Sequence, residues 1–170
     1  DAPTSGQVLW NGQPIANAEI PHYRSHISYL SQRPALLEGT VEDNLRFPFS
    51  LKTLRQRRFD RDAVTILLGH AGKAVDFLTK NALDLSGGES QVVSLIRTLQ
   101  LNPEVLLLDE PTAALDPTSS RDVEALISAW FAGDNARAYL WVSHDLDQAR
   151  RMSDIHWQMS AGVLSKAAQP

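Results

Sequence analysis

Residues 105–111 read Val-Leu-Leu-Leu-Asp-Glu-Pro, and this stretch decides the fold class of the chain. An uninterrupted apolar run such as 105–108 is typical of a central parallel strand that is covered on both faces. The run is followed at once by two carboxylates, Asp109 and Glu110. Because open α/β sheets bind ligands beyond the carboxyl ends of their parallel strands, we expect these carboxylates to face a binding site.

The segments on either side of this strand alternate between helix and strand. Apolar residues at helical spacing predict a helix over 87–101, and Asp116-Pro117 predicts the start of another. A second buried strand is expected over 139–142, and another short strand over 27–30. This order of strands and helices predicts an α/β layer with parallel strands.

Turn signals and a helical region complete the outline. Asn11-Gly12 and Ala161-Gly162 each predict a β-hairpin. Residues 40–100 are expected to be mostly helical. Within them, Thr40 followed by Asp43 predicts a capping box, in which each side chain accepts a hydrogen bond from the backbone amide of the other residue.

Composition excludes several classes of protein. With 170 residues and 43% hydrophobic residues, the chain is expected to form one globular domain and not to be disordered. Its 16 basic and 20 acidic residues give a net charge of -4, so no nucleic-acid partner is expected. The absence of cysteine excludes disulfides and thiolate metal sites. No apolar run approaches the length of about 20 residues that a transmembrane helix needs.

Leu85-Ser86-Gly87-Gly88-Glu89 lies at the start of the helix predicted over 87–101. Two glycines allow backbone amides to approach a ligand closely, and a helix amino terminus adds about half a positive charge. These properties suit a phosphate. Simple capping of the helix by Ser86 would explain the same residues, so both interpretations stay open on the sequence alone.

The side chains that follow the predicted strands can be assigned roles, although each has a plainer alternative. Asp109 is placed to hold a magnesium ion, and Glu110 can polarise a water for attack on a phosphoryl group. His144 can contact a γ-phosphate or orient that water, and Gln32 can touch a metal ion or water. Alternatively, the two acids merely end a strand in solvent, and His144 and Gln32 serve the structure.

The order of these motifs resembles the nucleotide-binding domain of ABC-type ATPases. In that family's terms the matching motifs are the Q-loop at Gln32, the signature loop at Leu85–Glu89, Walker B at Leu106–Asp109, the D-loop at Ala114–Asp116 and the switch histidine at His144. The resemblance implies an α/β P-loop NTPase fold of the ABC type. It implies a partial RecA-like parallel-sheet core, formed by residues 1–34 and 101–170, and an α-helical subdomain over 35–100.

The resemblance also implies ATP and Mg²⁺ as cofactors. It assigns catalytic roles to Glu110, His144 and Gln32, and metal binding to Asp109 together with Gln32. The residues that it assigns to nucleotide binding are Ser86, Gly87, Gly88, Glu89 and Asp116.

The same resemblance implies two protein partners. A second ATP-binding subunit would form a head-to-tail homodimer, in which the signature loop of one subunit serves the nucleotide of the other. A transmembrane permease subunit would dock on the segment that follows Gln32, which places the protein in the cytoplasm at the inner face of the cell membrane. Residues 41–51 and 96–100 resemble small bacterial ATP-binding subunits of the iron-export type.

One motif of the family is absent from the sequence. The phosphate loop reads G-x-x-x-x-G-K-[ST], and no segment of the 170 residues matches it. Gly72-Lys73 is followed by Ala74 and lacks the earlier glycine, so we interpret Lys73 as a solvated surface charge. We therefore expect the first strands and the phosphate loop to be missing, and the chain to be inactive alone.

Three other functions remain open on the sequence. The chain can be a noncatalytic module that lends its signature loop to a complete partner. It can belong to a soluble ABC ATPase that acts on ribosomes or DNA rather than on transport. A metal-dependent hydrolase built from Asp109, Glu110 and His144 is a more distant possibility.

Overall fold

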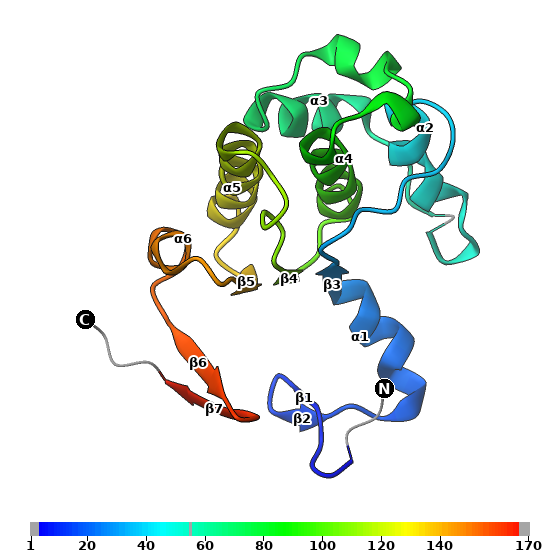
Figure 1. Cartoon of the computed structure of the whole chain (residues 1–170). Coiled ribbons are helices and arrows are strands. Elements are labelled where there is room, and N and C mark those ends of the chain that lie inside the picture. The colour runs from blue at the N-terminus through cyan, green and yellow to red at the C-terminus, as the bar shows by residue number, and fades with distance from the viewer. Residues whose placement is uncertain (1–3, 55, 167–170) are drawn as a thin grey trace.

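The computed structural model describes residues 4–54 and 56–166 (Figure 1). In chain order its elements are β1 (Leu9–Trp10), β2 (Gln13–Pro14), α1 (Ile20–His26), β3 (Ile27–Leu30), α2 (Val41–Arg46), α3 (Arg61–His70), α4 (Gly87–Leu99), β4 (Val105–Asp109), α5 (Pro117–Ala132), β5 (Ala138–Val142), α6 (Leu146–Met152), β6 (Trp157–Ser160) and β7 (Val163–Lys166). Short 3₁₀ turns lie at Asn17–Glu19, Phe47–Ser50, Lys52–Leu54, Val75–Thr79 and Ala82–Asp84.

A three-stranded parallel sheet organises the fold. Its order is β3-β4-β5, so the strand that carries Asp109 is central, as predicted. The register pairs Leu30 with Leu108 and Asp109 with Val142. Because all three strands run in the same direction, the residues that follow Leu30, Asp109 and Val142 emerge at one edge of the sheet.

The expectation that the strands over 105–108 and 139–142 are buried on both faces is wrong for the described residues. Leu106 and Leu108 are almost fully buried, whereas Tyr29 and Leu140, which point to the opposite face, are 61% and 57% exposed. Figure 1 shows the reason, because α4 and α5 cover only one side of the sheet. An apolar run indicates that a strand is suited to burial, but it does not indicate which helices pack on each face of the sheet.

The helical layer follows the predicted local chemistry closely. The capping box of Thr40 and Asp43 starts α2, with the Asp43 amide 3.1 Å from the Thr40 hydroxyl oxygen.

The interpretation of Lys73 as a solvated charge is wrong. Its ammonium lies 2.8 Å from a carboxylate oxygen of Asp122 on α5, and both side chains are less than a quarter exposed.

Both predicted hairpins form, as β1 with β2 and β6 with β7. Sequence periodicity did not predict α1 and α6, which are seven residues each and too short to show a clear apolar stripe. The helix predicted over 87–101 ends at Leu99, two residues early. Buried side chains of α2 to α5 and of the covered sheet face form one hydrophobic core.

Candidate functional site

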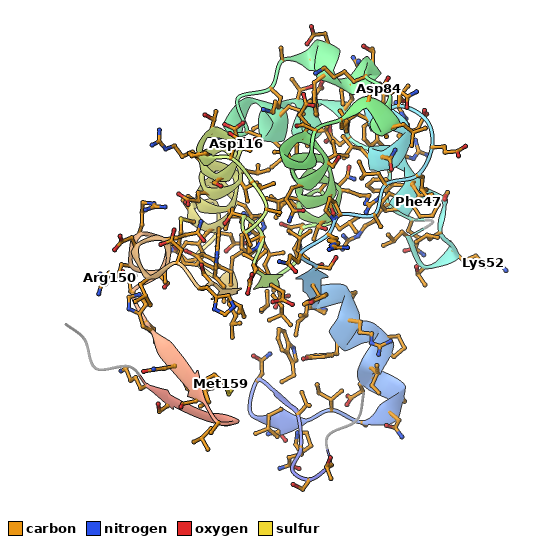
Figure 2. The ribbon with its side chains drawn as sticks, in the orientation of Figure 1. Phe47, Lys52, Asp84, Asp116, Arg150 and Met159 are labelled. Atoms are coloured by element: carbon orange, nitrogen blue, oxygen red, sulfur yellow. The ribbon has the colours of Figure 1, made fainter. Side chains whose placement is uncertain are left out.

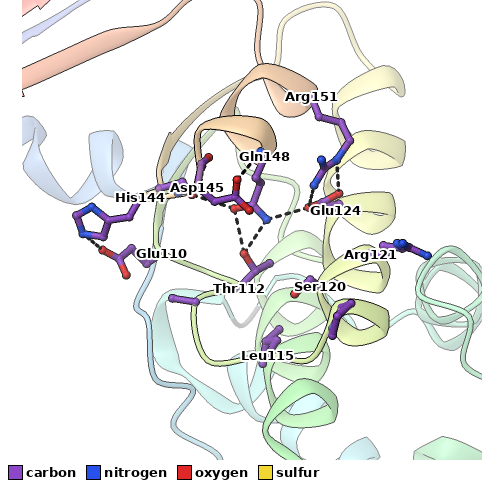
Figure 3. Close-up of a pocket in the computed structure, with 13 residues that line it drawn as sticks. Glu110, Thr112, Leu115, Ser120, Arg121, Glu124, His144, Asp145, Gln148 and Arg151 are labelled. Carbon is purple, nitrogen blue, oxygen red and sulfur yellow. Dashed lines mark hydrogen bonds and ion pairs between the residues drawn. The ribbon is translucent and has the colours of Figure 1, made fainter.

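Three predicted side chains meet at the carboxyl edge of the sheet. Glu110, directly after β4, has one carboxylate oxygen 2.6 Å from Nε2 of His144 (Figure 3). Its second oxygen accepts a longer hydrogen bond of 3.4 Å from Nε2 of Gln32. Each residue follows a different strand of the parallel sheet. The structure thus brings together three side chains that the sequence places after three different strands.

Asp109 faces a neighbour that the sequence analysis missed. The hydroxyl of Tyr29 donates a hydrogen bond of 2.9 Å to Oδ2 of Asp109. This hydrogen bond raises the pKa of the exposed Tyr29 phenol. The period of two along β4 places Leu107 and Asp109 on one face, but only the register, which pairs Tyr29 with Leu107, brings Tyr29 beside Asp109.

The backbone at Glu110 is strained. Its φ of 45° lies in the left-handed region, which residues other than glycine rarely adopt. Two hydrogen bonds hold this conformation: the Glu110 amide donates to the carbonyl of Val142 at 3.1 Å, and the Ala113 amide donates to the carbonyl of Glu110 at 3.2 Å. The neighbouring strand thus helps to aim the carboxylate of Glu110, and strain of this kind is common at functional sites.

A hollow of about 760 Å³ opens beside Glu110 and His144. Its wall contains a buried polar cluster that links Thr112, Glu124 and Gln148 (Figure 3). Burial opposes ionisation of Glu124, but hydrogen bonds from Arg151 and Gln148 outweigh it and lower the pKa of the carboxyl. Sequence analysis missed this cluster because α6, which carries Gln148, was not predicted.

The glycine loop at the amino terminus of α4, formed by Ser86, Gly87 and Gly88, contains a capping box. The Ser86 hydroxyl accepts from the Glu89 amide at 3.2 Å, and Glu89 accepts from the Ser86 amide at 3.0 Å. Glu89 also pairs with Lys80 at 2.8 Å. The hydrogen bonds from Lys80 and from the Ser86 amide lower the pKa of Glu89. Ser86 and Gly87 are exposed, whereas Gly88 is buried against Ser119 of α5.

Asp116 caps α5. It accepts hydrogen bonds from the Thr118 and Ser119 amides at 2.9 and 3.1 Å, and from the Ser119 hydroxyl at 2.5 Å. The bonds from Ser119 lower the pKa of Asp116. Figure 2 shows Asp116 at the end of α5 that lies away from the sheet.

Within one chain the structure does not join the glycine loop to the site at the sheet edge. Among the described residues, no hydrogen bond or ion pair links Ser86, Gly87 or Gly88 to Glu110 or His144. The described residues thus contain two separate features: a cluster of Gln32, Glu110 and His144, and an amide-rich loop in which Ser86 and Gly87 are exposed.

A second, apolar hollow of about 390 Å³ lies just beyond Gln32. Its lining includes three partly exposed apolar side chains, Leu37, Phe47 and Leu51. Arg97 of α4 forms part of the floor and donates a hydrogen bond of 2.8 Å to the carbonyl of Ala35. Burial lowers the pKa of Arg97.

Metal binding at the carboxyl ends of the strands would depend on oxygen donors. No group of three or more His, Asp or Glu residues in the described part of the chain is arranged to hold a metal ion by itself. Mg²⁺, however, is usually held by one or two carboxylates together with phosphate oxygens of a substrate. The carboxylate of Asp109, at the end of β4, is a ligand of the kind that this pattern requires.

Comparisons with known proteins agree with these motifs. The family described as ABC transporter matches residues 1–113. The chain is 40% identical over 167 residues to "Probable iron export ATP-binding protein FetA" of Escherichia coli (strain K12), and the match covers 98% of this chain and 72% of that protein. It is 34% identical to "ABC transporter I family member 17" of Arabidopsis thaliana, with 99% and 62% covered.

The solved structure of cbiO1 from Clostridium perfringens, described as part of the ABC transporter complex cbiONQ, has the same fold. The TM-score is 0.79 at 25% identity, and the match covers 96% of this chain and 65% of that one. The chain thus spans less than two thirds of cbiO1 and of the Arabidopsis relative. Between residues 4 and 166, leaving aside residue 55, no helix has both the length and the apolar character needed to cross a bilayer.

Proposed function

This chain belongs to the ABC transporter family of ATP-binding proteins, and we propose that it is an ATP-hydrolysing subunit that powers the movement of a substrate across a membrane. The observation that carries this proposal is the placement of the Glu110 carboxylate between Gln32 and His144. A carboxylate held in this way is suited to accept a proton from an attacking water.

In the proposed reaction, water attacks the terminal phosphorus of ATP while Glu110 accepts its proton. The new oxygen–phosphorus bond replaces the bond to ADP, which leaves with the electron pair. Nε2 of His144 holds one oxygen of Glu110, and Nε2 of Gln32 holds the other, so the lone pairs of Glu110 have a fixed direction. When bound by Asp109 and Gln32, Mg²⁺ would offset the negative charge of the phosphates.

The loop of Ser86, Gly87 and Gly88, whose first two residues are exposed, would complete the site of a second copy of the chain. Its amides lie at the amino terminus of α4, where the helix dipole favours an anion. Because this loop makes no hydrogen bond with Glu110 of its own chain among the described residues, a symmetric pair of subunits would place each loop against the other's nucleotide. Glu89 would support the glycine loop, and Asp116 would support the loop before α5, since both side chains cap helices.

The apolar hollow beyond Gln32 is the proposed contact for a membrane permease. Leu37, Phe47 and Leu51 would receive an apolar segment of that partner, and Gln32 would connect this contact to Glu110. The cbiO1 structure is part of a transporter complex, which supports a permease partner here. We propose accordingly that the protein lies at the cytoplasmic face of the membrane.

We extend the proposal to the division of the chain and to the transported substrate. Residues 1–34 and 101–170 would form the ATPase core, with 35–100 as a helical subdomain that carries both the hollow and the glycine loop. The similarity to FetA supports an iron-export type of transporter. Faster loss of radioactive iron from cells that express the protein with its permease would test this assignment, and an unchanged rate would oppose it.

A second function, in which the chain lends its loop to a complete partner and hydrolyses nothing itself, is favoured by one observation. Ser86 and Gly87 are exposed, and among the described residues they make no hydrogen bond to Glu110 or His144, so the loop can serve the nucleotide of another chain. Mixing the chain with an intact ATP-binding subunit distinguishes the two functions. If the chain lends its glycine loop, it should stimulate ATP hydrolysis by the intact subunit. Ser86→Arg should abolish this stimulation, because the long arginine side chain would fill the space of the phosphate-facing serine.

The experiment that tests the main proposal is ATP hydrolysis by the complete natural protein and by its Glu110→Gln variant. Loss of the proton acceptor should lower kcat about 100-fold or more while the KM for ATP changes little. A glutamine variant with the activity of the natural protein would refute the role of Glu110.

A further inference from the structure

We propose that Gln148 is a positioning residue for ATP hydrolysis, whose buried side-chain amide fastens the loop that carries Glu110 to the loop that carries His144. This inference rests on the proposed function. It concerns the polar cluster in the wall of the larger hollow, and neither the family motifs nor the contacts of Glu110 include that cluster.

Gln148 contacts both loops directly. Its Nε2 lies 2.8 Å from the hydroxyl oxygen of Thr112, two residues after Glu110. Its Oε1 accepts a hydrogen bond of 3.0 Å from the hydroxyl of Ser143, the residue before His144. Gln148 is only 5% exposed, so water does not compete freely for these bonds.

Glu124 of α5 fixes which way the amide of Gln148 points. Nε2 of Gln148 donates a hydrogen bond of 2.8 Å to Oε1 of Glu124. Arg151 neutralises the same carboxylate through bonds of 2.8 and 3.1 Å. An ionised carboxylate can only accept, so the NH₂ group of Gln148 must face Glu124 and its oxygen must face Ser143. The cluster therefore has one orientation that satisfies every partner.

Because the NH₂ group and the oxygen of the Gln148 side chain face different partners, the charge at position 148 decides whether the hydrogen bonds of the cluster can form. Glutamate has nearly the same shape as glutamine, but in Gln148→Glu two carboxylates would meet with no donor between them, and the cluster would open. In the double variant Gln148→Glu with Glu124→Gln, the amide at 124 donates and the carboxylate at 148 accepts. Thr112 and Ser143 can then donate to position 148, so the double variant should close the cluster again.

The first measurement is hydrogen exchange of two backbone amides in the complete natural protein without nucleotide. The Glu110 amide reports on one loop through its bond to Val142, and the Asp145 amide reports on the other through its bond of 3.0 Å to the Ser143 hydroxyl. Gln148→Glu should speed exchange at both amides about tenfold, as expected when a buried hydrogen-bonded group is lost. The double variant should return both rates to within about twofold of the natural protein.

The second measurement is steady-state ATP hydrolysis by the same proteins. Gln148→Glu should lower kcat about tenfold or more and leave the KM for ATP within about twofold, since the cluster aims Glu110 and His144 but touches no substrate. The double variant should recover kcat. Asp147→Asn, on the exposed face of α6, is the matched control and should change neither measurement.

The outcomes separate this inference from the proposed function. If the natural protein does not hydrolyse ATP, the proposed function fails, and hydrogen exchange alone decides whether Gln148 joins the loops. Unchanged exchange in Gln148→Glu, or a double variant as impaired as the single one, overturns the inference. Should Gln148→Glu not fold, Thr112→Val removes one link, and it must speed exchange at Glu110 more than at Asp145 for the inference to stand.

Discussion

Gly88 and Ser119 bring the amino ends of α4 and α5 together so closely that a β-carbon at position 88 would lie 2.2 Å from the Ser119 hydroxyl oxygen. Gly88, the second glycine of the glycine loop, thus has a packing role within its own chain. We predict that Gly88→Ala lowers the free energy of unfolding by about 1–3 kcal/mol, because the two helices must move apart.

Urea unfolding measures this effect, and Ser119→Gly provides its control. In the Gly88→Ala background, Ser119→Gly removes the two atoms that would clash and should recover part of the lost stability. If the two substitutions are simply additive, the contact between residues 88 and 119 does not set the helix spacing.

Glu89 gives the glycine loop a predictable dependence on pH. Its pKa is lowered in the folded chain by Lys80 and by the Ser86 amide, so its contribution to stability is present above the ordinary glutamate pKa. The contribution is lost as the pH falls through the lowered value, because protonation then favours the unfolded chain. Glu89→Gln should cost about 0.5 kcal/mol at neutral pH, since glutamine keeps the cap but loses the ion pair with Lys80.

Chemical unfolding at a series of pH values checks this prediction. The difference between the natural chain and Glu89→Gln should shrink as the pH falls from about 4.3 through the lowered pKa. Asp84→Asn, an exposed acid before the same loop, serves as the comparison. A difference that stays constant down to the acid transition would show that ionisation of Glu89 does not stabilise the loop.

The left-handed backbone of Glu110 predicts an opposition between stability and activity. Glycine adopts a φ of 45° without the steric cost that a side chain meets. Glu110→Gly should therefore be more stable than Glu110→Gln by about 1 kcal/mol, although both lack the proton acceptor. Thermal unfolding of the two variants makes the comparison, and equal melting temperatures would show that the backbone there is unstrained.

The apolar hollow beyond Gln32 predicts a substitution that uncouples transport from hydrolysis. Phe47→Asp should place a charge in the hollow and weaken association with the permease by about tenfold or more, while leaving hydrolysis by the isolated protein intact. Co-purification from detergent-solubilised membranes measures the association. Ile66→Asp is the matched control because Ile66 is 63% exposed and lies outside the hollow. Equal retention of both variants would place the permease contact elsewhere.

The sequence was sufficient to predict which catalytic candidates converge. Gln32, Glu110 and His144 each follow an apolar strand, and parallel strands end at one edge, so their meeting follows from topology. The capping boxes at Thr40 and Ser86 were equally accessible, because a cap depends on residues three positions apart.

Other features depend on contacts between distant residues and could not be predicted in the same way. The pairing of Lys73 with Asp122 requires the packing of a loop after α3 against α5. The bond between Tyr29 and Asp109 requires the strand register, and the Gln148 cluster requires the position of α6. The one-sided burial of the sheet depends on where the helices pack, which periodicity within a strand does not encode.

The central claim is that each nucleotide is bound between Glu110 of one subunit and the Ser86 loop of another. Mixing two inactive forms of the complete protein, Glu110→Gln and Ser86→Arg, tests this claim through the rate of ATP hydrolysis. A shared site predicts that the mixture regains about a quarter of the natural rate, because half of the randomly formed dimers contain one intact site. A mixture that forms dimers but stays as inactive as its two components would contradict the account.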